Sequence, residues 1–153
     1  MPRKCRALGA LCAVFPALAL AQANPLARGL PDLSAAALNG RWNGAHIEQR
    51  ASCNSEPNNG FHGTYAEYIY DVDRLSGAIT LTENAVNGLH CTYFGPVARG
   101  AWTGEVSCSD GRTGTYSSRA FVITANEISV RLAIQLRGSE TCSIDAILGG
   151  SRF

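Results

Sequence analysis

The side chains with the most versatile chemistry in this sequence are three histidines, His46, His62 and His90. Imidazole can bind a metal ion or exchange a proton near neutral pH. A metal site requires several ligands to converge, but these histidines belong to three different predicted strands and no two are separated by a single residue. We therefore expect solvated or hydrogen-bonded histidines and no bound metal.

A second candidate is the acidic segment that begins at Asp71 and Asp73. It starts like the EF-hand calcium loop, which needs an oxygen ligand at its fifth position, glycine at the sixth and glutamate at the twelfth. Leu75, Ser76 and Thr82 occupy these three positions instead. We interpret the segment as a hairpin turn.

The sequence shows no convincing catalytic constellation. Glu48 and Glu67 could be imagined as the carboxylate pair of a glycosidase, but nothing in the sequence fixes their separation. No G-x-S-x-G nucleophile elbow occurs, and residues 149–151 are better explained as the exit from a strand. The sequence therefore favours a protein that is not an enzyme and carries no cofactor.

The first 23 residues have the composition of a secretory signal peptide. A basic start with Arg3 and Lys4 precedes an apolar stretch over residues 7–20, and residues 21–23 form an A-x-A cleavage site. The apolar stretch is too short for a membrane span and contains Pro16. We expect export to the periplasm or the extracellular medium after cleavage near Ala23.

The overall composition excludes several classes of protein. Of the 153 residues, 46% are hydrophobic and 16% are charged, which fits a single globular domain and not a disordered chain. Cleavage would leave ten basic residues against twelve acidic ones, so a nucleic-acid partner is disfavoured. No later run is long and apolar enough to span a membrane. The abundance of alanine and glycine, with Lys4 as the single lysine, suggests a bacterial coding sequence.

Four cysteines remain after cleavage: Cys53, Cys91, Cys108 and Cys142. An even number of cysteines in an oxidising compartment predicts two disulfides. The gaps of 38, 17 and 34 residues do not match the close pairs that bind zinc.

Turn signals define the elements that position these residues. Residues 24–39 are expected to form an extended lead-in and a single helical turn over residues 35–38, which Ser34 can cap. From Gly40 on, segments rich in β-branched and aromatic residues alternate with turn residues, and no helical period occurs. We predict eight strands, at about residues 41–50, 61–72, 77–82, 89–95, 101–108, 113–123, 128–136 and 142–148.

The connections between these strands are mostly short and contain turn residues such as Asn87-Gly88. Loops of hairpin length require antiparallel neighbours. A meander of eight strands removes its two open edges by closing on itself. We therefore predict an all-β fold, an eight-stranded antiparallel up-and-down barrel over residues 40–153.

This topology discriminates among the three possible disulfide connectivities. When successive strands alternate in direction, all four cysteines fall at one end of the barrel. Strands four and five are neighbours, and strands one and eight meet at the seam. The predicted bridges are therefore Cys91–Cys108 and Cys53–Cys142, of which the second would lock the seam.

Gly40-Arg41-Trp42 opens the first predicted strand directly after the helical turn, and Arg152 follows the last strand. Counting down from the expected seam bridge places Trp42 beside Arg152 and Phe153. The arrangement resembles the calycin superfamily, which comprises lipocalins, avidin-like proteins and related bacterial inhibitors. The resemblance implies that Trp42 closes one barrel end and that Arg152 packs across its ring.

Residues 30–42 also look like the start of the small periplasmic inhibitors of secreted metalloproteases. In that family a free N-terminal strand fills the cleft of the protease, and a G-x-W barrel follows. The resemblance implies an alternative function, inhibition of a secreted hydrolase by Asn24–Leu33.

Aromatic side chains are the main candidates for a ligand site. Tyr68, Tyr93, Trp102 and Tyr116 lie on predicted strands two, four, five and six. They either fill the interior, because an eight-stranded barrel is only just wide enough for its own side chains, or line a pocket for one small apolar ligand. The loop Ala51–Gly60 at the disulfide end either gates that pocket or serves only as a connection. Our hypothesis is a secreted, non-enzymatic binding protein for a small, mostly apolar ligand.

Overall fold

The computed structural model describes residues 35–98 and 100–152. The predicted signal peptide, the lead-in before Ala35 and the position of Phe153 lie outside the described residues. One short helix, α1 (Ala35–Leu38), occupies the predicted helical turn, and no helix in the described part of the chain is long and apolar enough to cross a bilayer.

Eight strands follow α1, and each corresponds to a predicted strand with its ends displaced by three residues at most. They are β1 (Gly40–Ala51), β2 (Gly60–Val72), β3 (Ala78–Ala85), β4 (His90–Ala98), β5 (Ala101–Cys108), β6 (Thr113–Ile123), β7 (Glu127–Arg137) and β8 (Ser143–Ser151).

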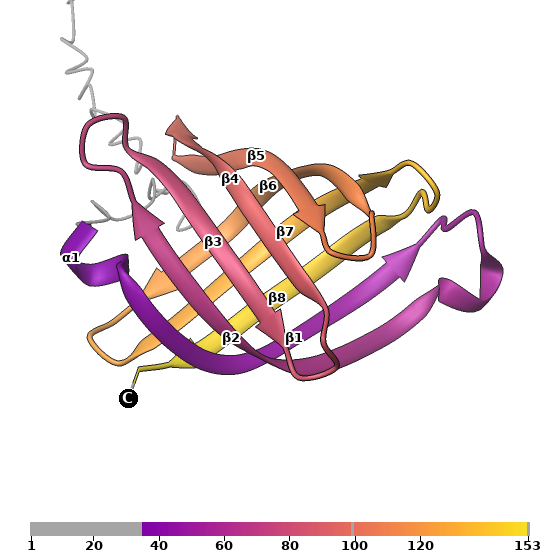
Figure 1. Cartoon of the computed structure of the whole chain (residues 1–153), viewed down its shortest axis with the longest axis horizontal. Helices are drawn as coiled ribbons and strands as arrows, with labels where there is room; N and C mark the ends of the chain where they lie inside the picture. The colour runs from indigo at the N-terminus through magenta and orange to yellow at the C-terminus, as the bar shows by residue number, and fades with distance from the viewer. Residues whose placement is uncertain (1–34, 99, 153) are drawn as a thin grey trace, which may run out of the picture.

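The strands form a closed barrel in which each strand pairs with its neighbours in sequence and β8 returns to β1. All pairs are antiparallel, and the seam register sets Ile47 of β1 opposite Ile147 of β8. Figure 1 shows α1 and the end of β8 on one side of the barrel and the β1–β2 loop on the opposite side. The predicted up-and-down barrel is confirmed.

The two-residue period of each strand decides which side chains face the interior. Five apolar side chains of β7 are buried in alternation with exposed or half-buried neighbours: Ile128, Val130, Leu132, Ile134 and Leu136. In β1 the inward phase begins at Trp42 and passes through His46 and Glu48. Most strands therefore contribute apolar side chains to the interior, whereas β1 contributes a polar row.

Glycines allow neighbouring strands to approach very closely at three places, one of which is Gly114 of β6, whose Cβ would lie 2.3 Å from the Gln135 carbonyl oxygen on β7. A Cβ atom at Gly44 of β1 would lie 1.6 Å from the carbonyl oxygen of Gly149 on β8. A Cβ atom at Gly95 of β4 would lie 1.9 Å from the carbonyl oxygen of Thr103 on β5. No larger residue fits at such a contact, which is typical of the tight corners of a barrel.

Trp42, α1 and Arg152 close one end of the barrel. Trp42 is fully buried, and its indole Nε1 donates a hydrogen bond to the Leu38 carbonyl at 3.1 Å. The Arg152 guanidinium carbon lies 4.3 Å from the centroid of the Trp42 ring. Nη2 of Arg152 also donates to the carbonyls of Ala37 at 2.7 Å and Asn39 at 2.9 Å. This is the packing that the resemblance to calycins implies.

Both disulfides lie at the opposite end of the barrel. They join Cys53 to Cys142 and Cys91 to Cys108, so the predicted connectivity is confirmed. The first bridge connects the end of β1 to the start of β8. The seam is therefore fastened by a covalent bond at this end and by Arg152 at the other.

The β1–β2 loop contains one turn of 3-10 helix, η2 (Glu56–Asn58), and is bound to the β7–β8 turn. The Asn54 amide N–H donates to the Thr141 carbonyl at 3.0 Å, and the Thr141 N–H donates to Asn54 Oδ1 at 3.1 Å. The Asn54 side-chain amide donates to the Ser139 carbonyl at 3.1 Å. These bonds, together with the Cys53–Cys142 bridge, hold the loop in one position.

Candidate ligand-binding site

A cluster of aromatic rings fills much of the barrel interior. The Trp102 ring packs against Tyr116 with 4.7 Å between centroids, and against Tyr70 and Tyr93 at 6.4 and 6.5 Å. The Trp102 Nε1 donates to the Gly95 carbonyl at 3.1 Å. All four rings are buried. The cluster is a packed floor rather than an open aromatic pocket.

Three buried phenols, Tyr68, Tyr70 and Tyr116, have hydroxyl groups with no hydrogen-bond partner among the described residues. Burial raises the pKa of each phenol, and the negative charge of Glu83 raises the pKa of Tyr68 and Tyr70 further. The three hydroxyls therefore stay protonated at physiological pH and remain available as donors inside the barrel.

A cavity of about 230 Å³ lies above this floor, at the disulfide end. It runs from exposed residues such as Asn87 to buried ones such as Glu83. Its apolar wall consists of Leu89, Tyr93, Val106, Ile134, Leu136, Ile144 and the Cys91–Cys108 bridge. Its polar wall consists of His46, Glu48, Arg50, His62, Thr64, Glu83 and Arg112.

The rim of the cavity lies where β2 extends past β3. The ladder between these strands begins at Ala66 and Ala85, so residues 60–65 of β2 pair with β1 alone. His62, Gly63 and Thr64 line the cavity on this side, and the β3–β4 turn lines it on the other. The hydrogen bond from Val86 N–H to the Tyr65 carbonyl, at 2.9 Å, joins the two sides at their base.

The polar wall is organised around His46. Its Nδ1 lies 2.6 Å from Glu83 Oε1, and its Nε2 lies 3.3 Å from Glu48 Oε2. The Tyr93 hydroxyl donates to Glu83 Oε2 at 3.1 Å. Arg50 Nε donates to Glu48 Oε1 at 2.6 Å, and Arg50 Nη2 forms an ion pair with the same oxygen at 2.5 Å. A chain of five side chains thus runs from the rim to the aromatic floor.

The two carboxylates control the charge of His46. Burial by itself lowers the pKa of this imidazole, but hydrogen bonds and charge from Glu48 and Glu83 outweigh burial and raise the pKa to about 9. Burial likewise opposes ionisation of Glu48, but His46 and Arg50 lower its pKa to about 2. At neutral pH the network therefore contains an imidazolium ion next to an ionised Glu48.

Two arginines complete the polar wall near the rim. Arg112 donates from Nε to Asp110 Oδ2 at 2.7 Å. The Nη1 atoms of Arg50 and Arg112 both face the Glu140 carboxylate, at 3.9 and 3.6 Å, beyond hydrogen-bond distance. Glu140 Oε1 instead accepts a short hydrogen bond from the Asn58 side chain.

The predicted ligand-binding residues are divided between the floor and the cavity. Tyr93 lines the cavity, whereas Tyr68, Trp102 and Tyr116 do not. Trp102 and Tyr116 support Tyr93 from below through ring contacts. Tyr68 lies directly opposite Glu83 across the β2–β3 ladder.

No residue of the predicted gating loop, Ala51–Gly60, lines the cavity. The loop braces the rim from outside, because Asn58 holds Glu140 and also accepts a hydrogen bond on its carbonyl oxygen from His62 Nε2, at 3.1 Å.

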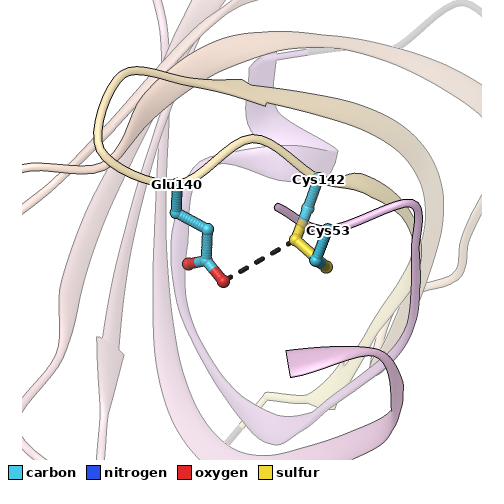
Figure 2. A group of neighbouring side chains, drawn as sticks. All are labelled: Cys53, Glu140 and Cys142. Carbon is cyan, nitrogen blue, oxygen red and sulfur yellow. Dashed lines mark hydrogen bonds between the residues drawn. A yellow bond between two sulfur atoms is a disulfide. The ribbon is translucent and has the colours of Figure 1, made fainter. Parts of the chain in front are cut away.

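One group of potential metal ligands lies close together within residues 35–98 and 100–152, namely Cys53, Glu140 and Cys142 (Figure 2). Glu140 Oε1 is 3.6 Å from Cys142 Sγ. Both sulfurs belong to the disulfide, so neither can supply the thiolate that a metal site needs.

The other chemically versatile residues occupy separate places. His62 reaches the cavity, but His90 is exposed and bonds to Asn84 Oδ1 at 2.9 Å. Glu48 points inward, whereas Glu67 forms an ion pair with Arg41 on the outer surface, so the two carboxylates do not face each other.

The predicted hairpin turn after β2 is present. Asp73 Oδ1 accepts the N–H groups of Leu75 and Ser76, at 2.8 and 3.3 Å, and these bonds lower the pKa of Asp73. The Gly77 N–H donates to the Asp73 carbonyl at 2.8 Å. The Asp73 carboxylate therefore stabilises the turn.

Sequence reasoning missed Glu83 and the inward direction of His46, Glu48 and Arg50. The predicted third strand ended at Thr82, which left Glu83 in a turn, whereas β3 continues to Ala85. A signal was present in β1. Trp42, which the resemblance places inside the barrel, sets an inward phase that includes residues 46, 48 and 50.

Comparison of this chain with protein-family models, with curated proteins and with solved structures finds no match. The likeness to calycins therefore rests on the closed eight-stranded barrel and on the Trp42–Arg152 contact.

Proposed function

We propose that this protein is an exported, non-enzymatic binding protein whose calycin-like barrel holds one small, mostly apolar ligand. The cavity at the disulfide end is the observation that carries the proposal. Ligand pockets are usually apolar clefts with a few fixed polar groups that orient the ligand. This cavity has an apolar wall opposite a hydrogen-bonded polar one.

The size of the cavity limits the ligand. An engineered apolar cavity of about 150 Å³ accommodates benzene. A cavity of about 230 Å³ matches one ring, or a short branched chain, with a small polar group.

The rim is built to keep its shape without a ligand. The Cys91–Cys108 bridge is part of the cavity wall, and the Cys53–Cys142 bridge fixes the adjacent loop. A site that is already ordered loses little conformational entropy when it binds. Two disulfides also suit the oxidising compartment to which a signal peptide would direct the chain.

Phenylethanol, a neutral ligand with one ring, is a suitable probe for this proposal. We expect saturable binding in an NMR titration, with the largest shift changes at cavity residues such as Tyr93, Val106 and Ile134. Val106→Phe places a ring inside the cavity and should abolish binding. Val122→Phe is the matched control, because Val122 is exposed on β6 outside the cavity.

Native mass spectrometry of freshly purified protein provides a second readout. A small mass that is lost on denaturation should accompany the wild type and Val122→Phe but not Val106→Phe. The proposal fails if neither phenylethanol nor a charged analogue with the same ring binds saturably, or if Val106→Phe and Val122→Phe bind the probe equally well.

The alternative function, hydrolase inhibition, depends on residues 24–33, which lie outside the described residues. Deletion of this segment separates the two functions. Val106→Phe, which fills the cavity, should abolish phenylethanol binding, whereas deletion of residues 24–33 should leave that binding intact.

A further inference from the structure

We propose that the ligand is an acid, with an anionic carboxylate bound by Arg50 and Arg112 and an apolar body against Tyr93, Val106 and Ile134. This inference rests on the proposed function and assigns its ligand class. It is based on the hydrogen-bonding groups of the polar wall: some already have partners within the protein, and others do not.

Both carboxylates of the polar wall already face donors of the wall itself. Glu83 accepts from His46 on one oxygen and from Tyr93 on the other. Glu48 Oε1 accepts a hydrogen bond from Arg50 Nε and pairs with Arg50 Nη2, and Glu48 Oε2 lies 3.3 Å from His46 Nε2. A cationic ligand would have to displace one of these internal donors to reach Glu48 or Glu83.

The donors, in contrast, are only partly used. Arg50 uses Nε and Nη2 on Glu48, and Arg112 uses Nε on Asp110. Neither Nη1 of Arg50 nor the two Nη atoms of Arg112 make a hydrogen bond within the described residues, although both guanidinium groups line the cavity. Guanidinium groups are well suited to bind a carboxylate through several N–H donors.

Glu140 is a negative group that faces the same donors. Its carboxylate lies between the two guanidinium groups without a hydrogen bond to either, and it is held by Asn58. An incoming acid would therefore compete with Glu140, whose carboxylate forms ion pairs with Nη1 of Arg50 and of Arg112 at 3.9 and 3.6 Å, and it would be repelled by the Glu140 charge. Removal of the Glu140 charge should therefore increase the affinity for an acid. If the cavity bound its ligand through apolar contacts alone, this removal would not change the affinity.

The experiment compares three probes with the same ring: phenylacetate, phenylethanol and phenylethylamine, which are anionic, neutral and cationic at neutral pH. Isothermal titration calorimetry measures the affinity of each. We expect phenylacetate to bind about tenfold or more tightly than either of the others, which corresponds to the gain of about one charge-assisted hydrogen bond.

Two charge variants, each with a matched control, test the residues. Arg112→Gln should remove the preference for phenylacetate, whereas Arg119→Gln, which removes an exposed arginine on the outer face of β6, should keep it. Glu140→Gln should increase the affinity for phenylacetate several-fold and leave that for phenylethanol unchanged. Glu127→Gln removes the same charge at the opposite barrel end and should change neither affinity.

The outcomes separate the two proposals. Equal binding of all three probes, tighter binding of phenylethylamine, or a preference for phenylacetate that survives Arg112→Gln would overturn the acid assignment and leave the binding function intact. Failure of all three probes to bind would overturn both. Near-ultraviolet circular dichroism of each variant shows whether the barrel is folded. If Arg112→Gln does not fold, Arg112→Lys, which keeps the charge but loses the planar fork, should reduce the preference.

Discussion

His46 and Glu83 form a largely buried ion pair on the inner face of the barrel wall, with 2.6 Å between Nδ1 and Oε1. The two residues come from β1 and β3, which are not neighbours in the sheet. Their contact links the two strands that flank β2, and Glu48 approaches the same imidazole from β1 itself. The stability of the barrel should therefore depend on the charges of this group.

The network predicts a pH dependence with two limbs. The pKa of His46 rises from 6.5 to about 9 on folding, so its contribution is complete below pH 6.5 and is lost as the pH rises toward 9. The pKa of Glu48 falls from 4.5 to about 2, so its contribution is complete above pH 4.5 and is lost as the pH falls toward 2. Both are present between pH 4.5 and 6.5.

Urea unfolding with intact disulfides, followed across the pH range, checks this expectation. The free energy of unfolding should be highest in that window and should decrease by on the order of 3 kcal/mol on the alkaline side. His46→Gln should flatten the alkaline limb, and His90→Gln should leave it unchanged because His90 is exposed. A wild-type protein whose stability does not change between pH 6 and 9.5 would contradict the assignment.

Glu83→Gln tests the buried pair itself. Removal of one partner leaves the other charge buried with less compensation, so we expect a loss of about 3–5 kcal/mol in the free energy of unfolding. Glu67→Gln is the matched control, since Glu67 pairs with the exposed Arg41 and surface pairs contribute less than about 1 kcal/mol. Equal effects of the two substitutions would show that the buried network contributes no more than a surface pair.

Gly44→Ala tests the tight corner between β1 and β8. The added Cβ would collide with the Gly149 backbone, which cannot move aside as a side chain can, so we expect a loss of about 3 kcal/mol or more. Gly63→Ala is the control, because the nearest atom to its Cβ would be 3.7 Å away. That substitution should change stability by about 1 kcal/mol at most, in the stabilising direction. Thermal unfolding of both variants measures the difference.

The two disulfides should differ in their contributions. Cys53–Cys142 closes 89 residues and Cys91–Cys108 closes 17. On the chain-entropy model these loops correspond to about 4–5 and about 3 kcal/mol. Paired Cys→Ser substitutions at each bridge, compared by urea unfolding, should therefore show the larger loss at the seam. The reverse order would indicate that the unfolded chain retains structure around the seam.

Local signals were sufficient to predict most of the fold. Turn residues separate the strands, the alternation in β7 identifies its inward face, and the meander restricts the disulfides to one connectivity. The short helical turn and the eight strands followed from the same signals. Each of these features depends on residues that are close in sequence or on the alternating direction of successive strands.

The site was much harder to predict, because it depends on contacts between distant strands. His46 and Glu83 are 37 residues apart, and neither is unusual in its own segment. Whether aromatic rings fill a barrel or leave space depends on how they pack. Trp102 and Tyr116 pack tightly, and the cavity remains above them. The sequence signal for whether rings fill the barrel or leave space is a polar residue at an inward-facing strand position.

The closed end formed by α1, Trp42 and Arg152 gives the molecule a direction. β1 begins and β8 ends at that end, and the cavity lies at the other. A fusion partner or a surface tether attached beyond either of these strands would be anchored behind the barrel, with the rim facing away from it. The protein could thus be immobilised in a uniform orientation through one attachment point, and a sensor built in this way would present every binding site to the solution.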